Sequence, residues 1–434
     1  MTDIIIEQLP KYELMQDSGF EWIGDLPSSW NLLSVKQIYR LVMEESGKNH
    51  SLELLSVYSD IGVRPRAELQ EKGNKASSTD GYWLVRKGDF VVNKLLAWMG
   101  GLGLSEYDGV TSPAYDVLRP RKEICGSYFN YLFRSPACTS ELKKHSRGIM
   151  DMRLRLYFDK FGVVKVPFPS LQEQKAISTF LDKKTLKIDE AIAIKQKQIE
   201  LLKERKHIII QQAVTQGLNP DAPMKDSDVD WIGIIPEHWE VRRSKFLFTQ
   251  RKEKAWKDDV QLSATQKFGV IPQDEYEART GARVVKIQFH LDKRKHVEKD
   301  DFVISMRSFQ GGLERAWSRG CIRSSYVILR PLEPIEPNFY GYLLKLPMYI
   351  KALQRTASFI RDGQDLNFDN FSQVDLFIPP LEEQKAIADY VRGFMESSDD
   401  GISLMEEQIA KLKEYKTTLI NSAVTGKIKV TELA

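Results

Sequence analysis

The segment Trp22-Ile23-Gly24-Asp25-Leu26-Pro27-Ser28-Ser29-Trp30 returns later in the chain as Trp231-Ile232-Gly233-Ile234-Ile235-Pro236-Glu237-His238-Trp239. Both copies read W-I-G-x-x-P-x-x-W, and their first tryptophans are 209 positions apart. A second motif, Leu171-Gln172-Glu173-Gln174-Lys175-Ala176-Ile177, returns as Leu381-Glu382-Glu383-Gln384-Lys385-Ala386-Ile387, 210 positions later. Solenoid repeats recur every ~20–50 residues, so this period indicates a duplicated half-protein. A duplicated chain can imitate a symmetric dimer and is expected to bind its ligand at two related sites.

The bulk composition sets wide limits on this protein. Its 434 residues suffice for two or three domains, and 63 basic against 60 acidic residues give a net charge of +3. Any nucleic-acid surface must therefore come from local placement of charge. The three cysteines form no C-x-x-C motif, which excludes a sequence-evident zinc knuckle or disulfide framework. No apolar run approaches the length of a membrane span, and residues 1–10 lack the features of a signal peptide. We expect a cytoplasmic protein with no membrane partner.

Three zones repeat in the same order in each half. A tryptophan segment (residues 17–30 and 226–239) leads into a variable body, which is followed by a long segment of helical pattern. Framework markers recur within the bodies, such as Asp89-Phe90-Val91 and Asp301-Phe302-Val303. Short β-like runs alternate with helical stretches, so each body is expected to be a mixed α/β (α+β) domain. The expected domains are residues 1–165 (first tryptophan segment and first body), 170–216 (first helix), 217–375 (linker, second tryptophan segment and second body) and 380–427 (second helix).

The third zone predicts two long helices that pack on each other. Apolar residues recur there at spacings of three and four, which places a seam along one side of each helix. About 40 helical residues extend roughly 60 Å. A helix of that length with a polar outer face needs a partner, and the obvious partner is its duplicate. The residues expected at this interface are Ile177, Leu181, Ile192, Ile199, Leu202 and Ile209 from the first helix, with Ile387, Val391, Ile402, Ile409, Leu412 and Leu419 from the second.

Local signals predict where these helices begin and end. Ser170 with Glu173 has the pattern of a capping box. Gly217 and Gly426 stand where the helices are expected to stop. The stretch Glu396-Ser397-Ser398-Asp399-Asp400-Gly401 is poor helix material, so the second helix is expected to be kinked or broken there.

Together these motifs resemble a known family. The duplicated W-I-G-x-x-P-x-x-W segments, the two P-x-L-x-E-Q-K-A-I helix starts and the paired Ala213-Val214-Thr215 and Ala423-Val424-Thr425 ends are similar to those of the specificity subunit of type I restriction–modification systems. The resemblance covers nearly the whole chain.

The resemblance implies a fold and a function. It implies two target-recognition domains, each reading one half of a bipartite double-stranded DNA site, separated by two long antiparallel coiled-coil helices with pseudo-two-fold symmetry. Two modification subunits carrying S-adenosylmethionine would dock on this scaffold, joined by restriction subunits with ATP- and Mg-dependent translocase and nuclease activity. The resemblance implies no catalytic site and no bound metal or cofactor in this chain.

Polar residues near the repeated framework turns are the candidates for DNA contact. Arginine can bind guanine bidentately and glutamine can bind adenine, whereas lysine contacts to phosphate position the protein without specifying sequence. The candidates in the first body are Asn93, Lys94, Lys143, Lys144, Arg147, Arg153 and Arg155. Those in the second body are Lys293, Arg294, Lys295, Arg307, Gln310, Arg361, Gln364 and Asp365.

Two alternative functions remain open. Glu173-x-Lys175 and Glu383-x-Lys385, with Asp159 and Asp369 upstream, have a superficial likeness to a metal-dependent nuclease. Their place in the first turn of a long helix favours a capping role instead. The other alternative function is a coiled-coil assembly protein without a DNA role.

The repeated tryptophans also have two possible roles. Anchoring the tryptophan segments is a simpler explanation than direct binding of a ligand for Trp22, Trp30, Trp231 and Trp239.

Overall fold

The computed structural model describes residues 6, 8–48, 50–68, 79–148, 154–287, 293–356 and 366–432. The chain divides into two compact units, and each unit holds one body and part of each long helix. The first unit is Met1–Lys197 with Met405–Ala434, and the second is Gln198–Leu404. Among the described residues, no helix is both long and apolar enough to cross a bilayer.

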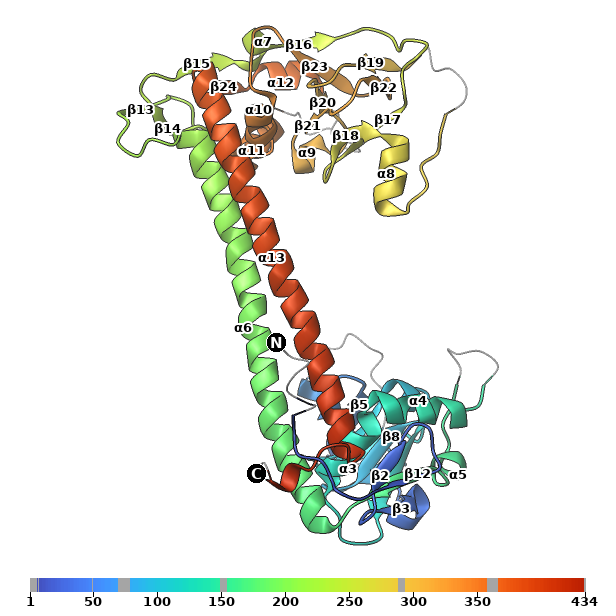
Figure 1. Cartoon of the computed structure of the whole chain (residues 1–434). Helices are drawn as coiled ribbons and strands as arrows, with labels where there is room; N and C mark the ends of the chain where they lie inside the picture. The colour runs from blue at the N-terminus through green and yellow to red at the C-terminus, as the bar shows by residue number, and fades with distance from the viewer. Residues whose placement is uncertain are drawn as a thin grey trace. The chain divides into compact units, whose positions relative to one another are not determined.

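The first body is built around a four-stranded antiparallel sheet with the strand order β4-β11-β8-β9, of which β8 is labelled in Figure 1. The strands of this sheet are β4 (Tyr39–Val42), β11 (Tyr115–Pro120), β8 (Phe90–Asn93) and β9 (Leu102–Leu104). Smaller antiparallel pairs surround it: β1 (Met15–Asp17) with β2 (Asp25–Pro27), β3 (Asn31–Ser34) with β12 (Lys165–Phe168), β5 (Leu55–Tyr58) with β6 (Gly62–Pro65), and β7 (Trp83–Val85) with β10 (Gly109–Thr111). The helical elements are α2 (Val35–Ile38), η1 (Arg66–Glu68), η2 (Ala97–Met99), α3 (Gly126–Arg134), α4 (Pro136–His145) and α5 (Phe158–Phe161).

The second body repeats this topology. Its four-stranded sheet has the order β16-β23-β20-β21, made of β16 (Phe248–Arg251), β23 (Val327–Pro331), β20 (Phe302–Ile304) and β21 (Glu314–Arg315). The surrounding pairs are β13 (Met224–Asp226) with β14 (Ile234–Pro236), β15 (Glu240–Arg243) with β24 (Asp375–Ile378), β17 (Leu262–Thr265) with β18 (Gly269–Pro272), and β19 (Lys295–Val297) with β22 (Gly320–Ile322). The helices are α7 (Ser244–Leu247), α8 (Gln273–Thr280), α9 (Ser308–Gly311), α10 (Pro337–Leu343), α11 (Pro347–Arg355) and α12 (Phe368–Ser372). The predicted duplication of a mixed α/β domain is confirmed.

Aromatic side chains fill equivalent positions of the two cores. In the first body, Phe90 on β8 packs against Tyr39 on β4 with 6.0 Å between ring centroids. In the second, Phe302 on β20 packs edge-on against Phe248 at 5.7 Å. All four rings are fully buried. Burying each such ring stabilises the fold by about 1.5–3 kcal/mol, so each body has its own hydrophobic core.

The two predicted long helices are α6 (Leu171–Gln216) and α13 (Leu381–Val424), which run antiparallel (Figure 1). In the first unit, the Lys416 ammonium lies 2.7 Å from the Asp189 carboxylate, and the Lys195 ammonium donates to Gln408 at 2.5 Å. In the second unit, the Lys206 ammonium lies 2.6 Å from Asp399. All twelve residues expected at the helix interface are buried or half-buried.

The expected break in the second helix is wrong, because α13 is continuous through residues 396–401. Ser398 is buried, and the carboxylate of Asp399 accepts two hydrogen bonds from Lys206 on α6. These contacts with the partner helix outweigh the low helix propensity of the segment. Both helices end near a glycine in the left-handed region, Gly217 (φ +75°) and Gly426 (φ +74°), as the sequence predicts.

The repeated Glu-Gln pair at the start of each long helix joins three parts of the unit. Ser170 and Glu173 form the predicted capping box: the Ser170 N–H donates to the Glu173 carboxylate at 3.2 Å, and the Glu173 N–H donates to Ser170 Oγ at 3.3 Å. The other Glu173 oxygen accepts from the indole N–H of Trp30 at 3.0 Å. Gln174 is buried and accepts from the N–H of Cys125 in the first body at 2.9 Å. Glu173 therefore holds the tryptophan segment and Gln174 holds the body.

The second unit has the same joint. Glu383 accepts from the indole N–H of Trp239 at 2.9 Å and from His238 at 2.5 Å. Gln384 is buried and accepts from the N–H of Glu336 at 2.9 Å. The predicted anchoring role of Trp30 and Trp239 is confirmed, and the acidic residues of both motifs are occupied by structural hydrogen bonds.

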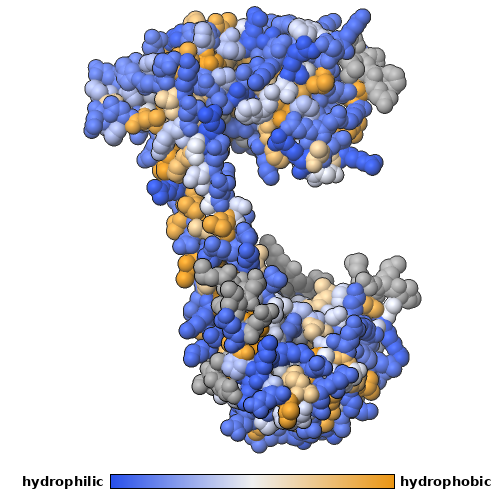
Figure 2. All heavy atoms as spheres, viewed as in Figure 1, coloured by the Kyte–Doolittle hydropathy of each residue, from blue (hydrophilic) through white to orange (hydrophobic). Residues whose placement is uncertain are grey.

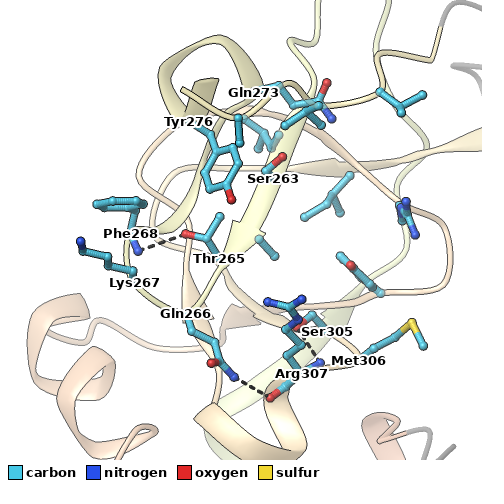
Figure 3. A pocket seen from close by; sticks show the side chains of 18 of the residues that line it. Ser263, Thr265, Gln266, Lys267, Phe268, Gln273, Tyr276, Ser305, Met306 and Arg307 are labelled. Atoms are coloured by element: carbon cyan, nitrogen blue, oxygen red, sulfur yellow. Dashed lines mark hydrogen bonds between the residues drawn. The ribbon is translucent and has the colours of Figure 1, made fainter. Parts of the chain in front are cut away.

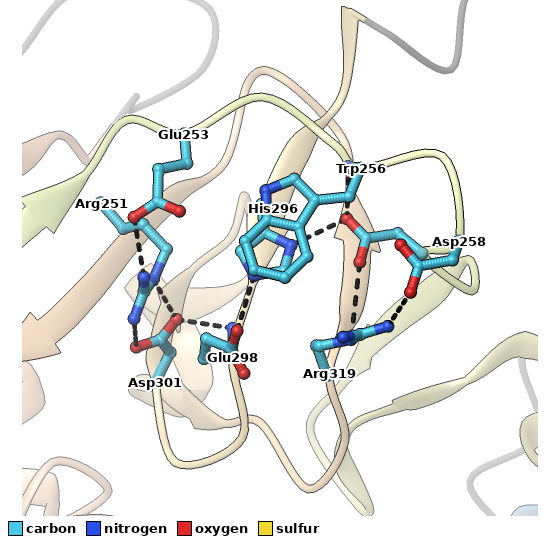
Figure 4. A network of polar contacts seen from close by, with 9 residues as sticks. Arg251, Glu253, Trp256, Asp258, His296, Glu298, Asp301 and Arg319 are labelled. Carbon is cyan, nitrogen blue, oxygen red and sulfur yellow. Dashed lines mark hydrogen bonds and ion pairs between the residues drawn. The ribbon is translucent and has the colours of Figure 1, made fainter.

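A buried histidine links two loops of the second body (Figure 4). His296 on β19 is fully buried, and its two ring nitrogens lie 2.8 Å from Asp259 and 2.9 Å from Glu298. The ring stacks on Trp256 with 3.8 Å between centroids. Ionised carboxylates at both positions can only accept hydrogen bonds, so this arrangement favours the imidazolium form, and these hydrogen bonds raise the pKa of His296 against the lowering effect of burial.

Candidate nucleic-acid interface

The second body contains a large groove of about 1090 Å³ (Figure 3). The hairpin of β17 and β18 forms part of it, the turn before α9 forms another part, and α8 with the segment after it contributes a third. The groove thus combines repeated framework residues, such as Leu262 and Tyr326, with the hairpin tip and the turn before α9, where side chains can vary without disturbing the sheet.

The charge of this groove has a single sign. Among the described residues that line it, none is acidic, although the whole chain is nearly balanced in charge. The basic residues that line it are Lys267, Arg283, Arg294, Arg307 and Arg323, and all but Arg294 are exposed. A cleft lined by one sign of charge concentrates its field and attracts a polyanion.

Two of the residues predicted to read bases lie in this groove, Arg307 and Gln310, and both are exposed. The turn that carries Arg307 is held by Ser305, whose hydroxyl accepts from the Arg307 N–H at 3.3 Å. Across the groove, the Gln266 amide donates to the Arg307 carbonyl at 3.1 Å (Figure 3). Gln354 of α11 also stabilises α9, because its side-chain amide donates to the Phe309 carbonyl at 2.7 Å. The guanidinium of Arg307 is therefore displayed from a fixed backbone.

The three basic residues 293–295, predicted as phosphate contacts, lie in different environments. Lys293 is exposed. Arg294 lines the groove but is only 6% exposed. Lys295 donates to the carbonyl of Tyr326 at 2.7 Å, and burial lowers the pKa of its ammonium group. Of the three, Lys293 is the one placed for a phosphate contact at the surface.

In the first body, the predicted contacts Asn93 and Lys94 are engaged within the fold. Asn93 is 7% exposed, and its side-chain oxygen accepts from the Leu95 N–H at 3.1 Å. Lys94 donates to the Pro113 carbonyl at 3.0 Å and lies 3.3 Å from the Asp116 carboxylate. As DNA contacts both remain predictions, but these bonds give them a structural role at the base of the turn.

The remaining basic candidates of the first body lie around that turn. Lys143 and Lys144 end helix α4, which packs on η2, and the Lys143 ammonium lies 4.9 Å from the ring centre of Trp98. Arg147 and Arg155 are exposed and pair across an antiparallel bridge, with both backbone N–H···O distances at 2.9 Å. Lys144 is partly neutralised by Glu141 at 3.1 Å. These residues form a basic rim beside η2.

Four predicted contacts, Arg153, Arg361, Gln364 and Asp365, lie outside the described residues.

Several groove residues were not predicted from the sequence. Gln266 and Lys267 form the tip of the β17–β18 hairpin, and Arg323 precedes the repeated Tyr326. A signal for the first two was present, since the repeated markers Leu262-Ser263 and Gly269-Val270 flank the tip. In the part of the chain that the structure describes, no three His, Cys, Asp or Glu side chains converge as a metal site.

The sequence pattern described as "Type I restriction modification DNA specificity domain" matches residues 67–204 and 236–414, well over half of the chain. Among curated proteins, the putative type I restriction enzyme MjaX specificity subunit of Methanocaldococcus jannaschii is 26% identical over 277 residues, which are 62% of this chain and 60% of that protein. The type I restriction enzyme MjaVIII specificity subunit of the same organism is 26% identical over 391 residues, covering 80% of this chain and 83% of that protein. This chain thus aligns with only part of the MjaX relative.

Two solved structures share the fold. One, from "Structural basis underlying complex assembly and conformational transition of the type I R-M system", has a TM-score of 0.68 at 15% identity, covering 93% of this chain and 99% of that chain. The HsdS subunit from Thermoanaerobacter tengcongensis has a TM-score of 0.58 at 14% identity, covering 95% of this chain and all of that one. Two matched domains, the curated relatives and the shared fold agree, and this chain belongs to the type I restriction–modification DNA specificity family.

Proposed function

We propose that the chain is the DNA-reading subunit of a type I restriction–modification complex, in which each body contacts one half of a bipartite target. The observation that carries this proposal is the groove of the second body, which is lined by five basic residues and, among the described residues, by no acidic one. Association with the phosphate backbone supplies much of the affinity for DNA and requires such a concentration of cations.

The groove combines the two kinds of contact that sequence-specific binding needs. Lys267, Arg283 and Arg323 are exposed at its surface and suit phosphate contacts. Arg307 and Gln310 stand on a turn held by hydrogen bonds on both sides, and these residue types can form two hydrogen bonds with guanine and adenine respectively.

The paired helices α6 and α13 fit the role of a spacer and a docking surface. A seam of apolar residues and three polar contacts holds them in register. Figure 2 shows apolar patches among the hydrophilic surface of the pair. Four large apolar side chains of α6 are exposed by 49–60%: Leu186, Ile194, Leu201 and Ile208. Exposed apolar residues at helical spacing are suited to binding a protein partner. We place two modification subunits there, with restriction subunits joining the assembly.

In this proposal the chain carries no chemistry of its own. S-adenosylmethionine, ATP and Mg belong to the partner subunits. The alternative of an intrinsic nuclease has little support, because Glu173 caps its helix and both Glu173 and Glu383 accept hydrogen bonds from tryptophan indoles. Incubating the purified chain with plasmid and Mg²⁺ or Mn²⁺ separates the two functions, since metal-dependent cleavage that survives further purification would establish the nuclease.

The deciding experiment maps methylated adenines in a library of split DNA sites exposed to the whole complex. A two-part target with a fixed gap is expected. Specific methylation at a continuous site, or none at any site, would overturn the proposal and favour a coiled-coil assembly protein without a DNA role.

A matched pair of insertions tests the spacer. One heptad placed after Ile192 and another after Leu412 keeps the antiparallel register, because these positions face each other between the Lys195–Gln408 and Lys416–Asp189 contacts. Each helix then lengthens by about 10 Å. The gap between half-sites is expected to change while their sequences do not. Replacing residues 37–165 with another such body should change one half-site only. Changed half-sites with an unchanged gap after the paired insertions would contradict the spacer role.

A further inference from the structure

The two bodies display different side chains from the same turn. In the second body, the Ser305 hydroxyl accepts from the N–H two residues ahead, and that residue is Arg307. In the first body, the Asn93 side chain makes the same bond to the N–H of Leu95. The first turn directly follows β8, which pairs with β11. The second directly follows β20, which pairs with β23. Leu95 therefore stands where the second body places a base-reading candidate.

Leu95 belongs to an exposed apolar tip. Leu95 is 41% exposed, Leu96 37% and Met99 53%. The Trp98 indole donates to the Leu95 carbonyl at 3.1 Å, and the Gly101 N–H donates to the Leu96 carbonyl at 2.8 Å. Because these bonds use main-chain carbonyls, the tip is fixed while its side chains face solvent. Exposing three large apolar groups from an ordered turn sacrifices burial unless a ligand covers them.

The surroundings of the tip indicate which ligand covers it. Lys143 lies over Trp98 at 4.9 Å. The Leu156 N–H donates to the Lys94 carbonyl at 2.9 Å, which places the exposed Arg155 beside the tip, and Arg155 pairs with Arg147. An apolar tip with a cationic rim is complementary to a DNA groove. There the rim meets phosphates, and the apolar groups can contact the 5-methyl group of thymine.

We propose that Leu95, Leu96 and Met99 read thymine methyl groups in the half-site bound by the first body. This inference rests on the proposed DNA-reading function and adds its chemistry. The first body then recognises apolar surface at the position where the second body presents a guanidinium.

The test substitutes deoxyuridine for each thymine of the target in turn, because deoxyuridine keeps the base-pairing groups and lacks only the methyl. Binding is measured with the full chain assembled with its methyltransferase subunits. In one half-site, each contacted thymine is expected to lose about fourfold in affinity, the value of one buried methyl-sized group. The same substitutions are then repeated with Leu95→Ala and Met99→Ala. These variants should bind more weakly to thymine-containing DNA and should have lost most of their sensitivity to deoxyuridine. Leu14→Ala is the matched control, since Leu14 is 73% exposed and lies outside the tip.

The outcomes separate the inference from the function on which it rests. Sequence-specific binding with no deoxyuridine effect, or an effect that the tip variants leave unchanged, overturns the thymine-reading inference alone. A first half-site without thymine overturns it as well. Tip variants that weaken assembly with the methyltransferase subunits but leave DNA reading intact would identify the tip as a protein-docking surface. If the native complex bound no DNA sequence specifically, the proposed function itself would be refuted.

Discussion

The carboxylate of Asp89 accepts two hydrogen bonds from the guanidinium of Arg119, at 2.9 Å from Nε and 2.8 Å from Nη2. The second body forms the same bidentate ion pair, in which the Asp301 carboxylate accepts from Nε of Arg251 at 2.7 Å and from its Nη2 at 3.1 Å. Asp89 and Asp301 are framework equivalents, but Arg119 lies on β11 and Arg251 lies on β16, which pairs with the counterpart of β11. The bodies thus keep the ion pair while its cation comes from a neighbouring strand.

Replacing Arg119 by methionine should destabilise the first body by about 3–5 kcal/mol, because it leaves the buried Asp89 carboxylate without its counter-ion. Denaturant unfolding combined with hydrogen exchange would assign the loss to the first body. Arg330, at the matching position of β23, is exposed, and Arg330→Met is expected to be nearly neutral. Equal effects of both changes would exclude the ion pair as the cause. The reciprocal variant Arg251→Met should destabilise the second body instead, where burial raises the pKa of Asp301 and Arg251 opposes that rise.

The stability of the second body should fall as the pH rises above about 6.5, the ordinary pKa of histidine. Burial lowers the pKa of His296, but hydrogen bonds to Asp259 and Glu298 outweigh it and raise the pKa overall. A raised folded-state pKa adds stability that is complete below the unfolded value and is lost as the pH passes through the folded value. The groups that face the ring are Asp259, Glu298 and Trp256, with Arg319 beside them (Figure 4).

Unfolding of the native chain and of His296→Gln across this range measures the effect. The native chain should show a pH dependence that the variant lacks, and the variant should be less stable at low pH. Identical pH profiles for the two proteins would show that the ring does not carry the charge.

Charge reversal at one seam contact should weaken the helix pair. Asp399→Lys places a second cation beside Lys206, with an expected loss of about 0.5–1 kcal/mol because the carboxylate is partly exposed. Adding Lys206→Asp should restore most of that loss. The equivalent pair Asp189 and Lys416 offers a matched test in the first unit. A double variant no more stable than the single one would mean that packing, not charge, sets the register.

Arg307→Ala should relax specificity at one base pair and weaken specific binding by about 1–3 kcal/mol. Lys267→Ala, by contrast, should weaken binding to all sequences and reduce the dependence of log affinity on log salt by about 0.9. Affinity measured on a panel of single-base target variants at several salt concentrations distinguishes the two effects. Lys245→Ala is the control, since Lys245 is exposed and is not among the groove residues. If Arg307→Ala weakened binding to all sequences equally and left base preference unchanged, Arg307 would be assigned a phosphate contact instead.

Signals that are local in the sequence predicted the structure well. The capping box of Ser170 and Glu173 spans one helical turn, so it could be predicted from the residues alone. Periodic apolar residues likewise predicted the helix pair. The predicted break at residues 396–401 was wrong, because a long-range bond from Lys206 to Asp399 stabilises the helix there.

The interface was harder to predict for the same reason. Asn93 and Lys94 look like free polar residues in the sequence, but Lys94 reaches Pro113 and Asp116 on another segment. Leu95 and Met99 were missed because apolar residues are ordinarily expected in a core, and only the fold reveals that they are exposed. The Gln266 and Lys267 tip needed the hairpin register to link it to Arg307.

The turns at Leu95 and Arg307 are secured by Asn93 or Ser305 and by main-chain groups, and neither displayed side chain is required for the turn itself. A single codon change at such a position can therefore alter what is bound without endangering folding. Descendants of this gene could acquire new targets one half at a time, each step passing through a viable protein.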